Sequence, residues 1–100
     1  MAYQIEFAES VKKQFKTLTA RQRVIILDAI ERQLIDEPLK ETRNRKVLRP
    51  NPLAPWELRV GDLRVFYEPD VVETAKKIRV LALGRKKGNK LYIGEKVVEL

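Results

Sequence analysis

The 100-residue sequence contains no cysteine and no histidine. Disulfide frameworks, thiolate metal sites, imidazole general bases and histidine-based catalytic triads are therefore excluded. Glycine is scarce, and the four glycines form no phosphate-binding fingerprint. No apolar run approaches the roughly 20 residues that span a bilayer, and the first residues do not resemble a signal peptide. We therefore expect a soluble, cytoplasmic chain that has no membrane partner and uses neither a metal nor a cofactor.

Positive charge is what the chain has in excess. Lysine and arginine outnumber aspartate and glutamate by 21 to 14, which gives a net charge of +7 in a length that suits one domain over residues 1–100. Residues 1–39 are balanced, and the excess lies in two basic runs, residues 40–49 and 76–90. Charge segregated in this way favours a polyanionic partner, either nucleic acid or a strongly acidic protein.

Residues 56–68 predict a β-hairpin, because Gly61-Asp62 suits a two-residue type II′ turn with φ > 0 at the glycine. This turn fixes an apolar face made of the pairs Val60–Leu63, Leu58–Val65 and Trp56–Tyr67. On the other face Arg59 lies directly opposite Arg64, beside Glu57. Like charges in such a pair are unfavourable. Three explanations stay open: an anion lies across the face, the arginines fan out into water, or Glu57 bridges them.

The residues before the hairpin predict one strand and two helices. Residues 2–7 alternate apolar and polar side chains, which indicates a short strand. Residues 9–18 change to helical spacing, and Thr19-Ala-Arg-Gln22 has the form of a capping box that opens a second helix over residues 20–36. The buried face of this second helix is predicted to carry Ile26 or Leu27, Ile30 and Leu34, and it is predicted to be widened by Val24 and Ile35. So short a connection predicts an antiparallel helical hairpin.

Residues 39–55 are basic and interrupted by prolines, so we predict a long loop with a turn of structure around residues 46–49. The most apolar strand, residues 78–83, is predicted to be central in an antiparallel sheet. Gly84 is predicted to end this strand, and residues 85–90 to follow as a basic turn. The tail predicts a last small hairpin around Gly94-Glu95. The fold class is therefore α+β, with an N-terminal strand, two helices and a three- to four-stranded, mainly antiparallel sheet.

The chemistry that remains is that of arginine, lysine, tyrosine and carboxylate, and it is sufficient to cleave RNA. RNA supplies its own nucleophile, the 2′-hydroxyl, so the protein need only align it with the phosphate and stabilise the developing charge. Arginine binds phosphate oxygens bidentately. A tyrosine or lysine in a cationic neighbourhood could accept the proton, and a second cation could protonate the leaving oxygen.

The hairpin LRVGDLRVFY (residues 58–67), the strand VLALG (residues 80–84), the basic turn and then Tyr92 resemble the RelE/ParE family of bacterial toxins over nearly the whole chain. The resemblance implies a toxin of a type II toxin–antitoxin system, held inactive by an acidic antitoxin in a hetero-oligomer. RelE-like members are ribosome-dependent endoribonucleases, or mRNA interferases, that inhibit translation by cutting mRNA. ParE-like members poison DNA gyrase and are not nucleases. Tyr92 and the long basic loop favour the nuclease, and the gyrase poison and a non-toxic RNA-binding protein stay open.

The resemblance also implies residue roles. Arg64 matches the transition-state arginine of the family, and Arg59 matches a basic residue near the nucleophile. Tyr92 matches a tyrosine that stacks on the substrate base and assists the chemistry. Glu57 stands where RelE carries a lysine, so it either acts as general base or pairs with Arg59 and weakens the site.

The basic turn is expected to supply a second phosphate-stabilising cation, which the resemblance places at Lys86 or Arg85. Six basic side chains of the loop and the turn are predicted to bind RNA. These are Arg45, Lys46, Arg49, Arg85, Lys87 and Lys90.

Overall fold

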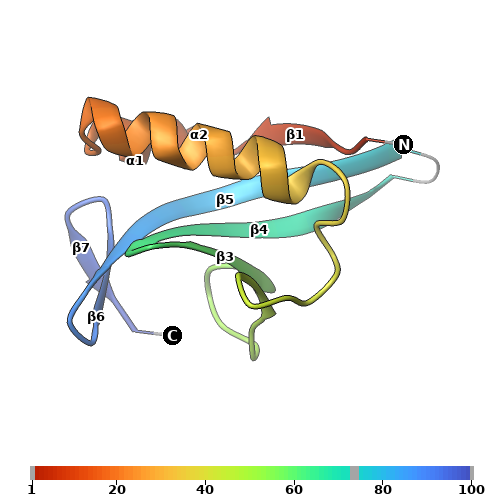
Figure 1. The fold of residues 1–100 in the computed structure, drawn as a ribbon. Helices are drawn as coiled ribbons and strands as arrows, with labels where there is room; N and C mark the ends of the chain where they lie inside the picture. Colours follow the sequence, from red (N-terminus) through yellow and green to blue (C-terminus); the bar gives the residue numbers. More distant parts are fainter. Residues whose placement is uncertain (1, 73–74, 100) are drawn as a thin grey trace.

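The computed structural model describes residues 2–72 and 75–99. In this part of the chain two helices cover one face of a seven-stranded sheet, as Figure 1 shows. The elements are β1 (Gln4–Phe7), α1 (Glu9–Lys16), α2 (Ala20–Leu34), β2 (Arg45–Val47), β3 (Trp56–Val60), β4 (Leu63–Val72), β5 (Ala75–Lys87), β6 (Lys90–Ile93) and β7 (Lys96–Val98). No helix of the described residues has the length and apolar character needed to cross a membrane.

The predicted α+β class is confirmed, but the sheet has more strands than the three to four expected. The strands follow the order β2-β3-β4-β5-β6-β7, and all neighbours on this path are antiparallel. Strand β1 pairs with β5 in parallel. β5 is central, as predicted, because β4 lies along one edge while β1 and β6 share the other.

Helix α2 begins at the predicted capping box. The Thr19 hydroxyl accepts from the Gln22 amide at 3.1 Å, and the Gln22 side chain accepts from the Thr19 amide at 2.9 Å. Its buried residues are Ile26, Ile30 and Leu34, as predicted. Val24 was expected to widen this face, but it is 68% exposed because the helix turns it away from the sheet.

The β3–β4 hairpin has the predicted register, from Trp56 opposite Tyr67 to Val60 opposite Leu63. Gly61 has a φ of 60°, as the two-residue turn requires. Tyr67 is fully buried on the helix side, stacks on Trp56 with ring centroids 5.9 Å apart, and donates its hydroxyl to the Pro38 carbonyl at 2.6 Å. Burial raises the pKa of the Tyr67 hydroxyl.

Strand β5 does not end at Gly84, so the predicted turn over residues 85–90 is wrong in its first half. Residues 85–87 continue the strand and pair with β6. A Cβ atom at Gly84 would lie 2.8 Å from the Tyr92 carbonyl oxygen and 2.7 Å from a side-chain carbon of Ile93. Gly84 is therefore needed for the close approach of β6, not for a chain reversal.

A second, smaller core lies on the sheet face opposite the helices. It contains Ala54, Phe66, Ala82 and Leu91. Figure 1 shows the segment before β3 and the β6–β7 hairpin below the sheet on this side. The predicted loop over residues 39–55 contains the short strand β2, which pairs with β3, and the predicted last hairpin around Gly94 is confirmed as β6 and β7.

Candidate functional site

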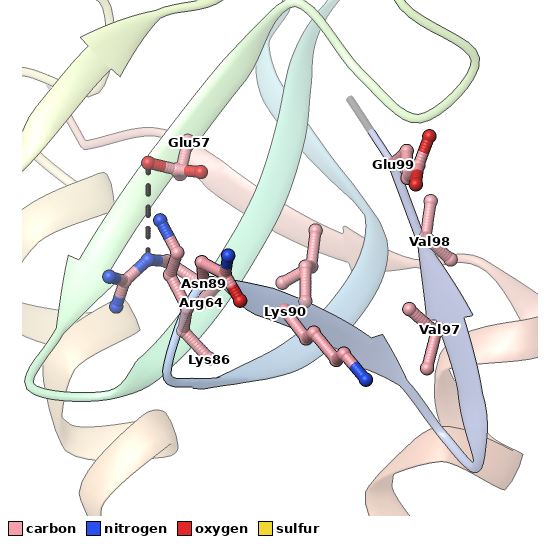
Figure 2. Close-up of a pocket in the computed structure, with 9 residues that line it drawn as sticks. Glu57, Arg64, Lys86, Asn89, Lys90, Val97, Val98 and Glu99 are labelled. Atoms are coloured by element: carbon pink, nitrogen blue, oxygen red, sulfur yellow. Dashed lines mark ion pairs between the residues drawn. The ribbon is translucent and has the colours of Figure 1, made fainter.

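An open cleft of about 560 Å³ lies on the sheet face away from the helices. Its polar lining consists of Glu57, Arg64, Lys86, Asn89, Lys90 and Glu99. Figure 2 shows Glu57, Arg64 and Lys86 at one end and Glu99 of the C-terminal segment at the other. The two β-hairpins, β3–β4 and β6–β7, therefore form the two sides of this cleft.

Strand register explains why Arg64 and Lys86 share the cleft. Arg64 in β4 lies between Arg59 of β3 and Gly84 of β5. Lys86 is two residues beyond Gly84, so its side chain projects from the same face of the sheet as that of Arg64. The Lys86 amide also donates to the Asp62 carbonyl at 2.6 Å, which ties this part of β5 to the hairpin turn. Side chains of β6, Ile93 and Leu91, fill the place that a side chain at Gly84 would take, so β6 borders the cleft on this side of Arg64.

The backbone of its own hairpin holds the Arg64 guanidinium in place. Nη1 donates to the Gly61 carbonyl at 2.7 Å and to the Leu63 carbonyl at 2.8 Å. The side chain is 12% exposed. A guanidinium with a fixed orientation and access to an open cleft is suited to hold a phosphate with little reorganisation.

Glu57 bridges the two arginines of the hairpin, which is one of the three arrangements the sequence left open. Its Oε1 lies 2.7 Å from Arg59 Nε and 4.0 Å from Arg64 Nε, and its side chain is 8% exposed. Figure 2 marks the ion pair with Arg64 by a dashed line. The like charges that face each other across β3 and β4 therefore have an internal counter-ion.

The cleft remains electropositive despite the two carboxylates of Glu57 and Glu99. Arg64, Lys86 and Lys90 line it, and within residues 2–72 and 75–99 neither lysine forms an ion pair. In the same residues no group of three or more acidic side chains could hold a metal ion. Such a set of groups can bind a phosphate through its cations and accept a proton at the carboxylate.

The structure does not bring Tyr92 and Arg85 into the cleft. They lie directly opposite each other on β6 and β5, one position away from the pair Lys86 and Leu91. Successive side chains of a strand point to alternate faces of the sheet, so Tyr92 and Arg85 project from the face opposite the cleft. There the Arg85 guanidinium carbon lies 5.7 Å from the centroid of the Tyr92 ring.

Arg45 is a buried structural residue, so its predicted RNA contact is wrong. The residue is 8% exposed. Its Nε donates to the Lys40 carbonyl at 3.0 Å, and its Nη1 donates to the Gln33 carbonyl and side-chain oxygen at 2.9 and 2.8 Å. These bonds join the end of α2 to the segment that follows it.

The other predicted RNA-binding residues keep accessible positions. Lys46 in β2 lies directly opposite Glu57, so it extends the positive charge of the cleft face. Arg49, Lys87 and Lys90 are exposed. Two polar cleft residues were missed from the sequence, Asn89 and Glu99, because a turn residue and a tail residue carry no motif.

Comparison with solved structures finds a likeness in fold. No family model and no curated protein sequence matches the chain. Among solved structures, a chain of the toxin–antitoxin complex RelBE2 from Mycobacterium tuberculosis is similar, with a TM-score of 0.71 and 21% sequence identity. The match covers 86% of this chain and 100% of that chain. At this identity the likeness shows the fold, so the predicted RelE-like fold is confirmed.

Proposed function

We propose that this chain is the toxin of a type II toxin–antitoxin system and an endoribonuclease that cleaves mRNA on the ribosome. The observation that carries the proposal is the position of Arg64 in an open, electropositive cleft beside Glu57 and Lys86. The RelE-like fold supports it, because a chain of a toxin–antitoxin complex has the same architecture. Because proteins that share a fold can differ in function, the proposal rests mainly on the chemistry of the cleft.

In the proposed reaction the scissile phosphate lies against Arg64 and Lys86. Glu57 accepts the proton of the 2′-hydroxyl as its oxygen attacks phosphorus and the O2′–P bond forms. The P–O5′ bond breaks, and Lys86 gives a proton to the leaving oxygen. The products are a 2′,3′-cyclic phosphate and a 5′-hydroxyl end. Arg64 stabilises the negative charge that develops on the phosphate oxygens.

Arg59 is proposed to position Glu57. Its Nε lies 2.7 Å from Glu57 Oε1, close enough to fix the carboxylate, and its side chain is 49% exposed. Arg64 lies further from the same carboxylate, at 4.0 Å. Glu57 thus binds Arg59 more tightly and leaves Arg64 to the substrate.

Basic side chains around the cleft are proposed to guide the RNA. Lys46 extends from the cleft face at β2, Lys90 lines the cleft, and Arg49 is exposed in the segment before β3. Backbone contacts of this kind bind without reading sequence. We propose mRNA and the ribosome as partners in the cytoplasm, and an acidic antitoxin that neutralises the same charge in a hetero-oligomer.

One observation favours the alternative, a non-nuclease toxin that binds DNA gyrase. Tyr92, the residue expected to stack on the substrate base, projects from the face opposite the cleft. A nuclease of this chain must then act with arginine, lysine and carboxylate alone. A toxin that acts by binding gyrase would not need a set of catalytic side chains.

Induction of the chain in a bacterial host separates the two functions. We expect growth arrest and new 5′ ends inside translated frames within minutes, and we expect Arg64→Ala to abolish both. Arg79→Ala is the matched control, because Arg79 is an exposed arginine of β5 that does not line the cleft. Arrest with intact transcripts and a DNA-damage response would replace the nuclease by the gyrase-binding toxin.

A further inference from the structure

The β5–β6 hairpin has a second charged face, opposite the cleft. It carries Arg85, Lys87, Lys90 and Tyr92, and we call it the outer face. Arg85 lies opposite Tyr92 and Lys87 lies opposite Lys90 in the antiparallel register. Arg85 and Lys87 are two residues apart on β5, so both leave the same side. Lys90, next to the turn, also reaches the edge of the cleft.

The charge of the outer face is unbalanced. Lys87 and Lys90 form a like-charge cross-strand pair, which is unfavourable by itself. Within the described residues, Arg85, Lys87 and Lys90 form no ion pair, and all three are exposed. In the cleft, the Glu57 carboxylate is the counter-ion of the like charges of Arg59 and Arg64. None of the four residues of the outer face is acidic, so these residues supply no such counter-ion. An anionic ligand would relieve the repulsion.

The outer face also has a stacking surface. The Arg85 guanidinium carbon lies 5.7 Å from the centroid of the Tyr92 ring, which is partly buried. The ring supports one side of Arg85, and the exposed Arg85 can offer its other side to a planar group. Nucleobases stack on aromatic rings and on guanidinium planes when they are unpaired. Flat cation and aromatic ring together favour a nucleobase over a carboxylate as the planar ligand.

We infer that the outer face of the β5–β6 hairpin is a second RNA-binding site, which holds an unpaired nucleobase by stacking on Arg85, supported from behind by the Tyr92 ring, and holds the adjoining phosphates by Lys87 and Lys90. The site rests on the proposed function in taking RNA as its ligand. It lies on the face of β5 opposite Lys86, so it contacts a different stretch of RNA from the one at Arg64. Arg85 and Tyr92 act here in binding and do not touch the reacting phosphate.

The test is direct binding of RNA to the purified full chain. The probe is a fluorescein-labelled single strand of about 12 nucleotides, a typical footprint for such proteins, with 2′-O-methyl riboses throughout so that it cannot be cleaved by 2′-oxygen attack. Fluorescence anisotropy is measured with wild type, Arg85→Ala, Lys87→Ala, Tyr92→Leu and Tyr92→Phe. Arg79→Ala is the matched control, since it removes one exposed arginine from the same strand.

We expect Arg85→Ala and Tyr92→Leu each to weaken binding about fivefold or more, as loss of one stacked base does. Tyr92→Phe keeps the ring and should bind like wild type. Lys87→Ala removes a proposed phosphate contact, so it should reduce the slope of log K against log salt by about 0.7, the value for one such contact to a single strand. Arg79→Ala should leave affinity within about twofold of wild type.

Several results would overturn the site. Equal losses in Arg79→Ala and Arg85→Ala would show binding by net charge alone. A duplex probe bound as tightly as the single strand, or an oligoglutamate peptide that competes as well as RNA, would refute base stacking. The proposed function fails separately: a chain that binds the probe through Arg85 and Tyr92 but never cleaves mRNA keeps this site and loses the nuclease.

Discussion

Replacing Glu57 by glutamine removes the carboxylate charge between two opposed arginines and keeps the shape of the side chain. Glu57 Oε1 lies 2.7 Å from Arg59 Nε and 4.0 Å from Arg64 Nε. Two unit charges about 4 Å apart interact by about 4 kcal/mol at an effective dielectric constant of about 20. Desolvation of the buried ions and the half-exposed position of Arg59 cancel much of this. We expect Glu57→Gln to lower the free energy of unfolding by about 1–2 kcal/mol.

Urea denaturation at pH 7 and low salt measures this loss. Glu37→Gln is the control, because it breaks an exposed ion pair with Lys40 of 3.7 Å and should cost less than about 0.5 kcal/mol. Sulfate then provides a second measurement at constant ionic strength. An anion that takes the place of the Glu57 charge should stabilise Glu57→Gln more than wild type, by about 1.4 kcal/mol at ten times its dissociation constant.

Two outcomes would refute this reasoning. If Glu57→Gln is as stable as wild type, the carboxylate does not hold the arginine pair together. If sulfate stabilises the variant and wild type equally, the place between Arg59 and Arg64 is not an anion site. Either result would also weaken the proposed phosphate position, since the phosphate is expected to bind against Arg64.

Three further substitutions test the packing that positions the cleft. Tyr67→Phe leaves the buried Pro38 carbonyl without its donor, so urea unfolding should report a loss of about 1–2 kcal/mol. Burial raises the pKa of Tyr67 above its ordinary 10.0, so the unfolded chain releases this proton first and wild-type stability falls as pH rises above 10.0; the fall should be shallower in Tyr67→Phe, and parallel pH profiles would contradict the burial. Arg45→Ala should cost about 2–4 kcal/mol in thermal unfolding because its bonds to carbonyl groups are buried, and an unchanged stability would return Arg45 to the surface. Gly84→Ala should lower stability by about 1–3 kcal/mol and speed amide hydrogen exchange in β6, because its Cβ would lie 2.8 Å from a β6 carbonyl oxygen; unaltered exchange would refute the close approach.

The sequence was sufficient to predict the β3–β4 hairpin and the start of α2, because local chemistry specifies both. A two-residue turn at Gly61-Asp62 leaves one register available, and this register places Arg59 opposite Arg64. Thr19 and Gln22 satisfy each other's backbone amides within one turn of helix. No contact with the rest of the chain is needed for either prediction.

The face of Tyr92 could not be predicted, because it depends on how far β5 extends. A glycine after an apolar run is typical of a strand end, so Gly84 was expected to stop β5 and residues 85–90 to form a loop. The close approach of β6 instead requires a residue without a side chain at Gly84. Once β5 continues, its pairing with β6 puts Tyr92 beside Arg85 and away from Arg64.

Arg45 shows the same limit in the loop before β3. Because several prolines follow Arg45 in the sequence, the segment was predicted to be a loop and the short strand β2 was missed. A basic residue in a basic loop was then interpreted as an RNA contact. Its acceptors, the Gln33 and Lys40 carbonyls, become available only when α2 ends beside β2. Alternation along β2 then buries Arg45 and leaves Lys46 on the face of the cleft.

Cleavage of a synthetic mRNA on programmed ribosomes by the purified chain decides whether the cleft is a nuclease site. We predict cuts that carry 5′-hydroxyl ends, a rate at least about 100-fold lower in Arg64→Ala, and a comparable loss in Arg64→Lys, which keeps the charge but not the bidentate fork. Circular dichroism checks that both variants are folded, and a 2′-deoxy nucleotide at the cut site should block the reaction. Intact mRNA with folded wild-type protein, or undiminished cleavage by Arg64→Ala, would contradict the nuclease.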